Sequence, residues 1–472
     1  MVLISGAWAM SNLNKPGSSS KSYSKELKVL DVKNNKLPSY QHRIDIRLES
    51  ESQAKDFMGS YKVSVEVPGL DVVIKEAKAP EIIRKASKSV DVRIFLPVMQ
   101  EYNNYIITYK DYSFELKNVG KSRSEAITSR ECFALNANTD SCLRDYFHKK
   151  VIREKSPVGA LDEINTLVKE DKGNLNKCHS WAHAAGEAAG WVYKDWAKAI
   201  QFAKNSCNFG YYHGVQEGLA AVVSTPEMGE KLNNICNVFI LDMMIVDCAH
   251  GLGHLAYWRT GGDYFESMKL CDGLRESKGV ESDNMVSCAA GVTMNWAIDY
   301  QSEATASGKH IFTKPAVSEP FSVCREIEGK NGVYLRAGCY NYIHFTEVEN
   351  KEVLSKIIEK CRRLTESVSE VWCTLGYARD YGHFPEVSVE EVLNECMKSS
   401  NKDAIWTCGQ GIVYVKIITT NKAGSAERVC RYFKAKNFDS SNYEKNCKLI
   451  KEMEERRLKS EGAILQVTTN RQ

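Results

Sequence analysis

The chain has 472 residues, enough for two to four domains of ordinary size. Hydrophobic residues make up 43% and charged residues 26%, which is typical of a globular protein with a sizeable core and argues against a disordered polymer. Lysine plus arginine (63) nearly balance aspartate plus glutamate (60), and the charges are spread along the chain. This balance offers no electrostatic case for binding nucleic acid.

Residues 1–25 are expected to be a signal-like or flexible segment. An apolar run at 2–10 ends in Ala7-Trp8-Ala9, a small-x-small pattern like a signal-peptidase site, and a Ser/Gly-rich spacer follows at 12–24. The run lacks a basic region before it, so either the true translation start lies upstream, which we expect, or the run is a chance apolar stretch. No stretch of 18 apolar residues occurs anywhere, so no transmembrane span is predicted.

Residues 26–122 read as a β-domain. Seven short runs of alternating or β-branched residues are separated by turn-forming residues at intervals near ten: 27–32, 43–48, 61–67, 72–76, 90–96, 105–109 and 113–119. This pattern predicts an antiparallel β-sandwich of the immunoglobulin or fibronectin type. The segment has no cysteine, so the immunoglobulin disulfide signature is absent, and an adhesion or spacer module is favoured over a catalytic one.

The chain has 16 cysteines, and all of them lie beyond the β-domain. None stands in a C-x-x-C pair, which excludes zinc ribbons, thioredoxin-type redox motifs and haem attachment. A structural disulfide framework remains. Because such frameworks persist in oxidising compartments, we expect an extracytoplasmic or secreted protein.

From residue 129 onward the sequence has helical periodicity, and the cysteines keep a rhythm. Pairs separated by 11, 14 or 16 residues begin at intervals of 35, 53, 37, 35 and 34 residues, the period of helix-turn-helix repeats. A glycine often follows the second cysteine by three residues, which indicates close packing by another helix. The rhythm predicts an all-α solenoid of disulfide-stapled αα-hairpins over 129–460, followed by a tail at 461–472.

Pairing each cysteine with its next neighbour is the parsimonious connectivity for such a repeat. The predicted disulfides are Cys132/Cys142, Cys178/Cys207, Cys236/Cys248, Cys271/Cys288, Cys324/Cys339, Cys361/Cys373, Cys396/Cys408 and Cys430/Cys447. The pair Cys178/Cys207 departs from this pattern, because both of its cysteines lie at the position that belongs to the second helix of a hairpin, in successive repeats. In period and cysteine placement the helical region resembles Sel1-like or TPR-like repeat proteins. The tryptophan, glycine and tyrosine pattern of TPR units is absent, so the resemblance implies an architecture and no partner or activity.

Histidines concentrate in three successive repeats. Five of the ten in the chain lie just after Cys178, Cys207 or Cys248, in the segments CHSWAHAAGE, CNFGYYHGVQE and CAHGLGH. His179 and His183 are spaced i, i+4, as are His213 and Glu217, and His250 and His254; Glu187 extends the first stripe. Because equivalent helices of a solenoid stack side by side, these imidazoles are expected to share one surface or cleft.

Imidazole and carboxylate groups from facing helices are how helical proteins bind transition metals. We predict His183, His213 and His254 as ligands, with His179, His250 and Glu217 as further ligands or orienting groups. Zinc, copper or iron would suit this donor set better than calcium or magnesium. In a catalytic site, the metal would activate water or support redox chemistry, with Glu217 as the base. No H-E-x-x-H motif is present, so a zincin is not predicted.

Two other interpretations of the histidines stay open. They could be hydrogen-bonded packing residues among the neighbouring aromatics, or part of an aromatic-lined pocket for a small ligand. The corresponding alternative function is a non-enzymatic scaffold that binds a protein or glycan. Elsewhere, His344 has the spacing of a degenerate copy of the same position, while His310 and His383 read as loop residues.

Overall fold

The computed structural model describes most of the chain between residues 25 and 460. The described residues are 25–26, 28–36, 42–49, 51, 62–67, 70–74, 81–86, 88–96, 104–109, 112–117, 128–134, 139–171, 173–174, 177–202, 207, 210–222, 236, 242–260, 262–274, 283–307, 319–348, 350–420 and 422–460. The expected signal-like run at 2–10 and the tail at 461–472 lie outside them.

The N-terminal part forms two β-sheets. Its described strands are β1 (Lys25–Glu26), β2 (Val29–Lys36), β3 (His42–Leu48), β4 (Lys62–Val67), β5 (Leu70–Ile74), β6 (Glu81–Ala86), β7 (Ser89–Leu96), β8 (Asn104–Tyr109) and β9 (Tyr112–Lys117). One sheet has the order β1-β9-β8-β4-β5 and the other β2-β3-β7-β6. Neighbouring strands are antiparallel, except β1 and β9, which are parallel.

The central pair β3 and β7 shows why these residues form a sheet with one buried face. Their cross-strand partners on that face are at most 1% exposed: Ile44/Ile94, Ile46/Val92 and Leu48/Val90. On the other face Arg47 pairs with Asp91 at 2.7 Å, and Arg93 with Asp45 at 3.2 Å. The alternation in the sequence therefore matches an apolar face and a charged face.

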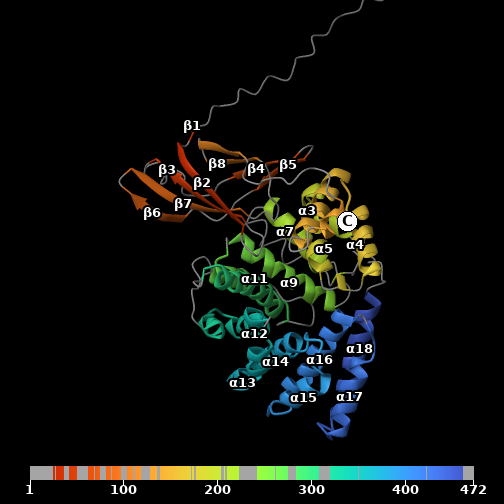
Figure 1. Ribbon diagram of the computed structural model, residues 1–472. Helices are drawn as coiled ribbons and strands as arrows, with labels where there is room; N and C mark the ends of the chain where they lie inside the picture. The colour runs from red at the N-terminus through yellow and green to blue at the C-terminus, as the bar shows by residue number, and fades with distance from the viewer. Residues whose placement is uncertain are drawn as a thin grey trace, which may run out of the picture.

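The rest of the chain is helical. Its described helices are α2 (Ser129–Phe133), α3 (Thr139–Glu154), α4 (Val158–Glu170), α5 (Cys178–Tyr193), α6 (Trp196–Ile200), α7 (Gly210–Val222), α9 (Asp242–Arg259), α10 (Tyr264–Asp272), α11 (Asp283–Ser307), α12 (Gly332–Tyr342), α13 (Lys351–Cys361), α14 (Ser367–Tyr381), α15 (Val389–Cys396), α16 (Lys402–Thr420), α17 (Ser425–Ala435) and α18 (Tyr443–Ser460), with 3₁₀ segments η4 (Pro320–Glu326) and η5 (Ile343–Glu347). A mostly helical chain with an N-terminal antiparallel β-region is thus confirmed (Figure 1).

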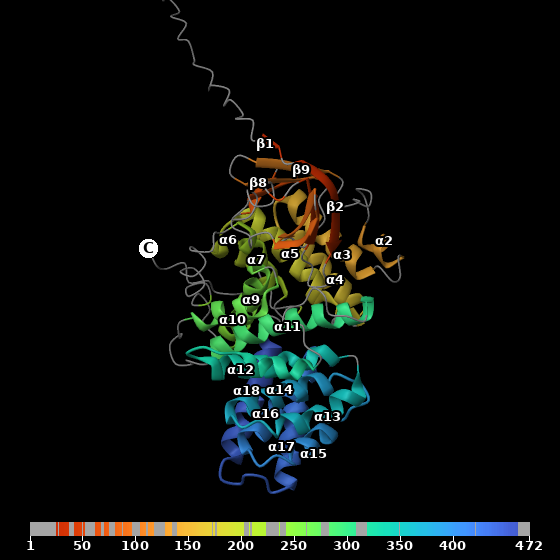
Figure 2. The ribbon, with the colours of Figure 1, turned by 90° about the vertical axis from the view of Figure 1, so that its left-hand side faces the viewer.

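In the helical region, each long helix packs against the next long helix along the chain. Contacts run from α3 to α5, α7, α9, α11, α12, α14 and α16 in that order. Figures 1 and 2 show the sheets at one end of the molecule and α13 to α17 at the other, with α9 and α11 between them. The specific architectures predicted, a sandwich and an αα-hairpin solenoid, stay predictions.

The glycine that often follows the second cysteine of a pair packs against the preceding long helix. A Cβ atom on Gly291 of α11 would lie 2.0 Å from the carbonyl oxygen of His250 on α9. One on Gly376 of α14 would lie 2.0 Å from the carbonyl oxygen of Asn341 on α12. Only glycine permits this approach, so these positions set the spacing between successive long helices.

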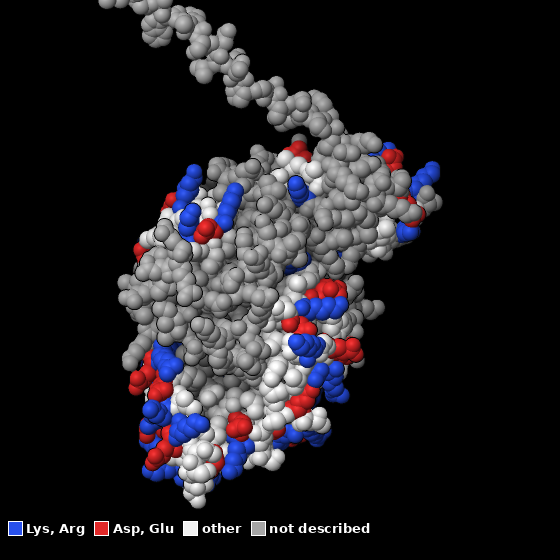
Figure 3. All heavy atoms as spheres, turned by 180° about the vertical axis from the view of Figure 1, so that it is seen from behind, with Lys and Arg blue, Asp and Glu red and all other residues white. Residues whose placement is uncertain are grey.

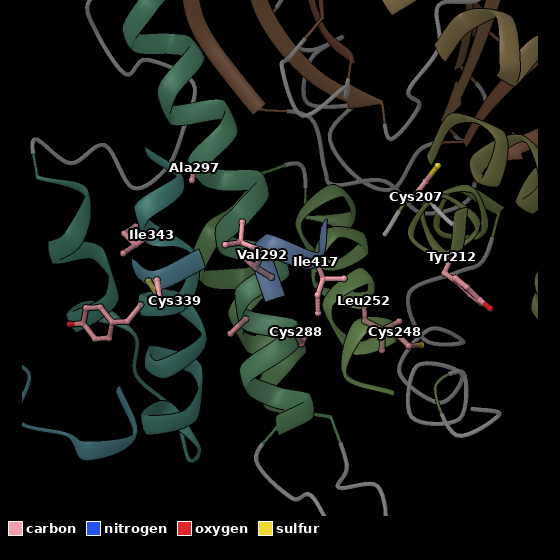
Figure 4. Close-up of a cluster of buried hydrophobic side chains, with 14 of the residues drawn as sticks. Cys207, Tyr212, Cys248, Leu252, Cys288, Val292, Ala297, Cys339, Ile343 and Ile417 are labelled. Carbon is pink, nitrogen blue, oxygen red and sulfur yellow. The ribbon is translucent and has the colours of Figure 1, made fainter. Parts of the chain in front are cut away.

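Eight disulfides cross-link the helical region, and no cysteine in the described structure is free. They join Cys132 to Cys142, Cys178 to Cys207, Cys236 to Cys248, Cys271 to Cys288, Cys324 to Cys339, Cys361 to Cys373, Cys396 to Cys408 and Cys430 to Cys447. These are the pairs that neighbour pairing predicts. Figure 4 shows Cys248, Cys288 and Cys339 within the apolar core that the long helices share.

The hydrophobicity of the helices and the distribution of surface charge are relevant to membrane and nucleic-acid partners. Among the described residues, none of the helices combines the length and the apolar character needed to cross a bilayer. On the face seen in Figure 3, basic and acidic side chains are intermingled over the described surface, as the near-neutral composition predicts.

Candidate metal centre

Three histidines on two adjacent helices form the compact centre of the site. His179 and His183 lie one turn apart on α5, and His213 lies opposite them on α7. Each can offer one ring nitrogen such that the three nitrogens all lie within 4.8 Å of one another. The ring centroids are 4.7 Å apart for His179 and His183, 5.4 Å for His179 and His213, and 5.3 Å for His183 and His213.

The pair on α9 extends this centre. The rings of His250 and His254 are 4.7 Å apart, and each is 5.5 Å from the ring of His213. His254 is also 6.1 Å from His183. All five imidazoles expected to meet do so, from three successive helices. The three histidines whose nitrogens lie closest together are His179, His183 and His213. The sequence analysis had instead predicted His254 as the third ligand, from its spacing to the preceding cysteine.

Glycines explain how two helices bring their histidines so close. A Cβ on Gly214, next to His213, would lie 1.9 Å from the carbonyl oxygen of His183. On the facing helix, a Cβ on Gly186 would lie 2.1 Å from the carbonyl oxygen of Tyr211. The backbones of α5 and α7 are therefore in direct contact, which leaves the flanking imidazoles side by side.

Hydrogen bonds fix the orientation of two of these rings. Nδ1 of His183 lies 2.9 Å from Oε2 of Glu217, and Nδ1 of His179 lies 3.0 Å from the carbonyl oxygen of Cys207. The carbonyl oxygen of Cys207 can only accept, so Nδ1 of His179 donates to it and Nε2 keeps its lone pair. The ionised form of Glu217 likewise accepts from Nδ1 of His183. A metal-binding imidazole commonly has its second ring nitrogen held by an outer partner of this kind.

Burial keeps three of the clustered histidines neutral. It lowers the pKa of His183 and of His250 well below the ordinary value, and that of His254 to about 4. Burial also raises the pKa of Glu217 to about 7. Neutral imidazoles are the form that coordinates a metal ion, so His183, His250 and His254 need no deprotonation near neutral pH.

His254 is the buried ring with the least hydrogen bonding. The His254 side chain is 3% exposed, and neither of its ring nitrogens has a hydrogen-bond partner of ordinary geometry among the described residues. The side chain of Asn295 lies nearby and favours the protonated form of the ring. A buried polar group without a partner costs about 1–3 kcal/mol. An ion or ligand in contact with His254 would remove that cost.

Behind the histidines lies a buried polar layer that the sequence analysis did not single out. Arg144 and His148 of α3 are 2% and 1% exposed. Nε2 of His148 is 3.4 Å from Oε2 of Glu187, so Glu187 faces α3. The sequence did offer a signal for this layer, because Arg144 and His148 are spaced i, i+4 on an otherwise amphipathic helix. A lone histidine in such a position, however, is more often a packing residue.

A second group of donors does not form a comparable centre. His344 lies close to the sulfur atoms of Cys361 and Cys373. These two cysteines are joined in a disulfide, and a disulfide sulfur lacks the thiolate charge that binds metals. His344 is fully buried away from the five-histidine array, His383 is exposed, and His310 lies outside the described residues.

A cavity of about 230 Å³ adjoins the histidines. His179, His213 and His250 line one side of it. The remaining walls come from α11, α12, α14, α16 and α18, and include Trp372, Arg379 and Tyr414. The cluster therefore borders a hollow large enough to hold a small molecule.

Comparison with models of known protein families, with curated proteins and with solved structures found no match to this chain. The function of this chain is therefore inferred from the chemistry of its candidate site.

Proposed function

We propose that this protein binds a transition-metal ion at the histidine cluster and uses it in hydrolytic or redox chemistry. His179, His183 and His213 would be the principal ligands, with His250 and His254 as additional ligands or orienting groups. The carrying observation is that nitrogens of the first three lie within 4.8 Å of one another. Metal–nitrogen bonds near 2 Å would need only small side-chain adjustments from there.

The donor set supports zinc, copper or iron. Imidazole suits these metals, whereas calcium and magnesium prefer oxygen ligands. Three protein ligands beside a cavity also fit catalytic centres, which keep one coordination position open for water or substrate.

Glu217 has two candidate roles in this proposal. The sequence pattern favoured it as a general base. Its hydrogen bond to Nδ1 of His183 supports an orienting role, because that contact fixes the ring and raises its basicity. We assign Glu217 to orientation and leave activation of water to the bound metal.

The proposal extends to location and architecture. Eight disulfides support an oxidising, extracytoplasmic environment, secretion being the specific case we propose. The successive packing of long helices supports a solenoid over 129–460 beside a β-sandwich over 26–122.

The alternative is a scaffold that binds a protein or glycan and uses the histidines for packing. The hydrogen bonds of His183 and His179 favour it, since they satisfy one nitrogen of each ring without an ion. In that case the array is an internal polar network, comparable to the pair formed by His148 and Glu187.

Elemental analysis of the purified, oxidised protein separates these functions. After incubation with zinc, copper or iron and removal of excess metal, near-stoichiometric metal is expected in the wild type. It should be lost in a His179→Ala/His183→Ala/His213→Ala variant and kept in His383→Ala, which changes an exposed histidine. No retained metal in a folded wild type would favour the scaffold.

A further inference from the structure

The cavity beside the histidines joins parts of the chain that are far apart in sequence. One wall holds His179, His213 and His250, and the others include Tyr414 of α16 and Met453 of α18. Because the last long helices reach the same hollow as α5, α7 and α9, the cavity exists only when the whole helical region is assembled. It is therefore a property of the intact fold.

The walls differ in chemistry. Besides the histidines, the lining includes Met294, Trp372, Leu375, Tyr414 and Met453, all partly exposed. Aromatic and thioether side chains that stay accessible in a hollow offer a favourable surface for an apolar ligand. The cavity thus combines three histidines with a group of aromatic, aliphatic and thioether side chains, and its lining also includes the polar residues Ser287, Asn341, Arg379 and Gln410.

Arg379 decides against an anionic ligand. Its guanidinium donates to Asp380 at 2.6 and 2.9 Å, and to Asn341 at 3.2 and 2.9 Å. It also lies 3.6 Å from the ring centroid of Tyr342. Its charge is neutralised and most of its donors are used, so little remains to bind a phosphate or carboxylate.

The cavity has room to enclose about one ring. An apolar cavity of about 150 Å³ takes up benzene. The present cavity, about 230 Å³, has room for one substituted aromatic ring. Several residues of a peptide or glycan chain would exceed it.

We propose that the cavity binds a small, uncharged aromatic molecule, with its polar group toward His179, His213 and His250 and its ring against Trp372 and Met294. This inference rests on the proposed function, because the polar group would coordinate the metal. The proposal implies that the substrates of the site are small aromatic molecules, and that the protein is neither a protease nor a polysaccharide hydrolase.

Two hydroxamates test the proposal on the zinc-loaded full chain. 4-Fluorobenzohydroxamate and acetohydroxamate share a chelating head, but only the first has a ring. We expect the aromatic probe to bind at least about tenfold more tightly, measured by fluorine NMR and by competition. Trp372→Ala should abolish that preference while leaving acetohydroxamate binding and zinc content unchanged.

Control variants separate the cavity from general effects of the substitutions. Trp196→Ala, at a partly buried tryptophan of α6 outside the cavity lining, should keep the preference. Met294→Ala provides a second cavity variant, in case Trp372→Ala alters folding as judged by circular dichroism. Equal binding of both hydroxamates, or a preference that survives both cavity variants, would overturn the proposal.

The metal-free protein distinguishes this proposal from the proposed function. If zinc does not bind, the proposed function fails, and 4-fluorobenzamide then probes the cavity alone. Binding of that probe that is lost in Trp372→Ala would support the aromatic site without a metal. No binding would overturn the cavity proposal as well.

Discussion

Nδ1 of His183 on α5 lies 2.9 Å from Oε2 of Glu217 on α7, and both side chains are buried. This contact crosses the helix pair that carries three of the five clustered histidines. It also determines which nitrogen of His183 is available to a ligand.

Replacing Glu217 should weaken metal binding without abolishing it. In Glu217→Gln the ring of His183 loses its carboxylate partner, and we expect metal affinity to fall by about 10- to 100-fold. Competition with a chromophoric chelator measures this loss. Glu187→Gln is the matched control, since Glu187 contacts His148 and should leave affinity nearly unchanged. Equal affinities for wild type and Glu217→Gln would refute the orienting role.

A methyl group at Gly214 should force α5 and α7 apart. The added Cβ would lie 1.9 Å from the carbonyl oxygen of His183, so Gly214→Ala should destabilise the fold by about 1–3 kcal/mol or more. Metal content should fall with it. Urea denaturation gives the free energy of unfolding. In the control Gly273→Ala, the new Cβ would lie 3.6 Å from the carbonyl oxygen of Leu270, an ordinary contact, and stability should be nearly unchanged.

Acid should destabilise the protein through its buried histidines. Burial lowers the pKa of both His148 and His344 to about 3, against an ordinary value of 6.5. The unfolded chain therefore binds more protons between these values. The contribution of these neutral histidines to the free energy of unfolding is complete above about pH 6.5 and is lost as the pH falls toward 3. Each histidine lowers the free energy of unfolding by at most about 1.4 kcal/mol per pH unit in this range.

Urea denaturation at pH 7 and pH 5 measures this loss of stability. In His344→Gln, which removes one titrating group, the difference between the two pH values should be smaller than in the wild type. An identical difference in both proteins would show that His344 is not buried in its neutral form.

The disulfides should contribute strongly to stability and leave no reactive thiols. Thiol titration of the unreduced, denatured protein should find almost none, whereas free cysteines would give about 16. Replacing Cys396 and Cys408 by serine opens a loop with a sequence separation of 12, which should cost roughly 3 kcal/mol of unfolding free energy. A stability loss near zero would mean that this bridge does not constrain the unfolded chain.

Local patterns in the sequence were enough to predict several elements. Alternation located the strand pair β3 and β7, and cysteine spacing predicted all eight pairs seen in the structure. These features depend on residues close together in the chain or on a regular repeat. The sequence analysis missed the two-residue strand β1 and also β6, which in the described structure pairs with β7 at the edge of its sheet. The segment EIIRKA of β6 lacks the alternation of a half-buried strand.

The histidine cluster was predictable only in part. The i, i+4 spacing placed His179 and His183 on one helix face, but the choice of His179 over His254 for the compact group depends on how closely α5 and α7 approach. That distance is set by contacts such as Gly214 against the backbone of His183, which bring together separate repeats.

The cavity was decided entirely by tertiary structure. Trp372 and Tyr414 read as ordinary helical residues in the sequence, yet they line the same cavity as His213. Their meeting depends on the summed rotation of many stacked helices, and no local pattern carries that information. The sequence by itself therefore determined the framework and the chemistry of the side chains, while packing over long distances decided which of them share a site.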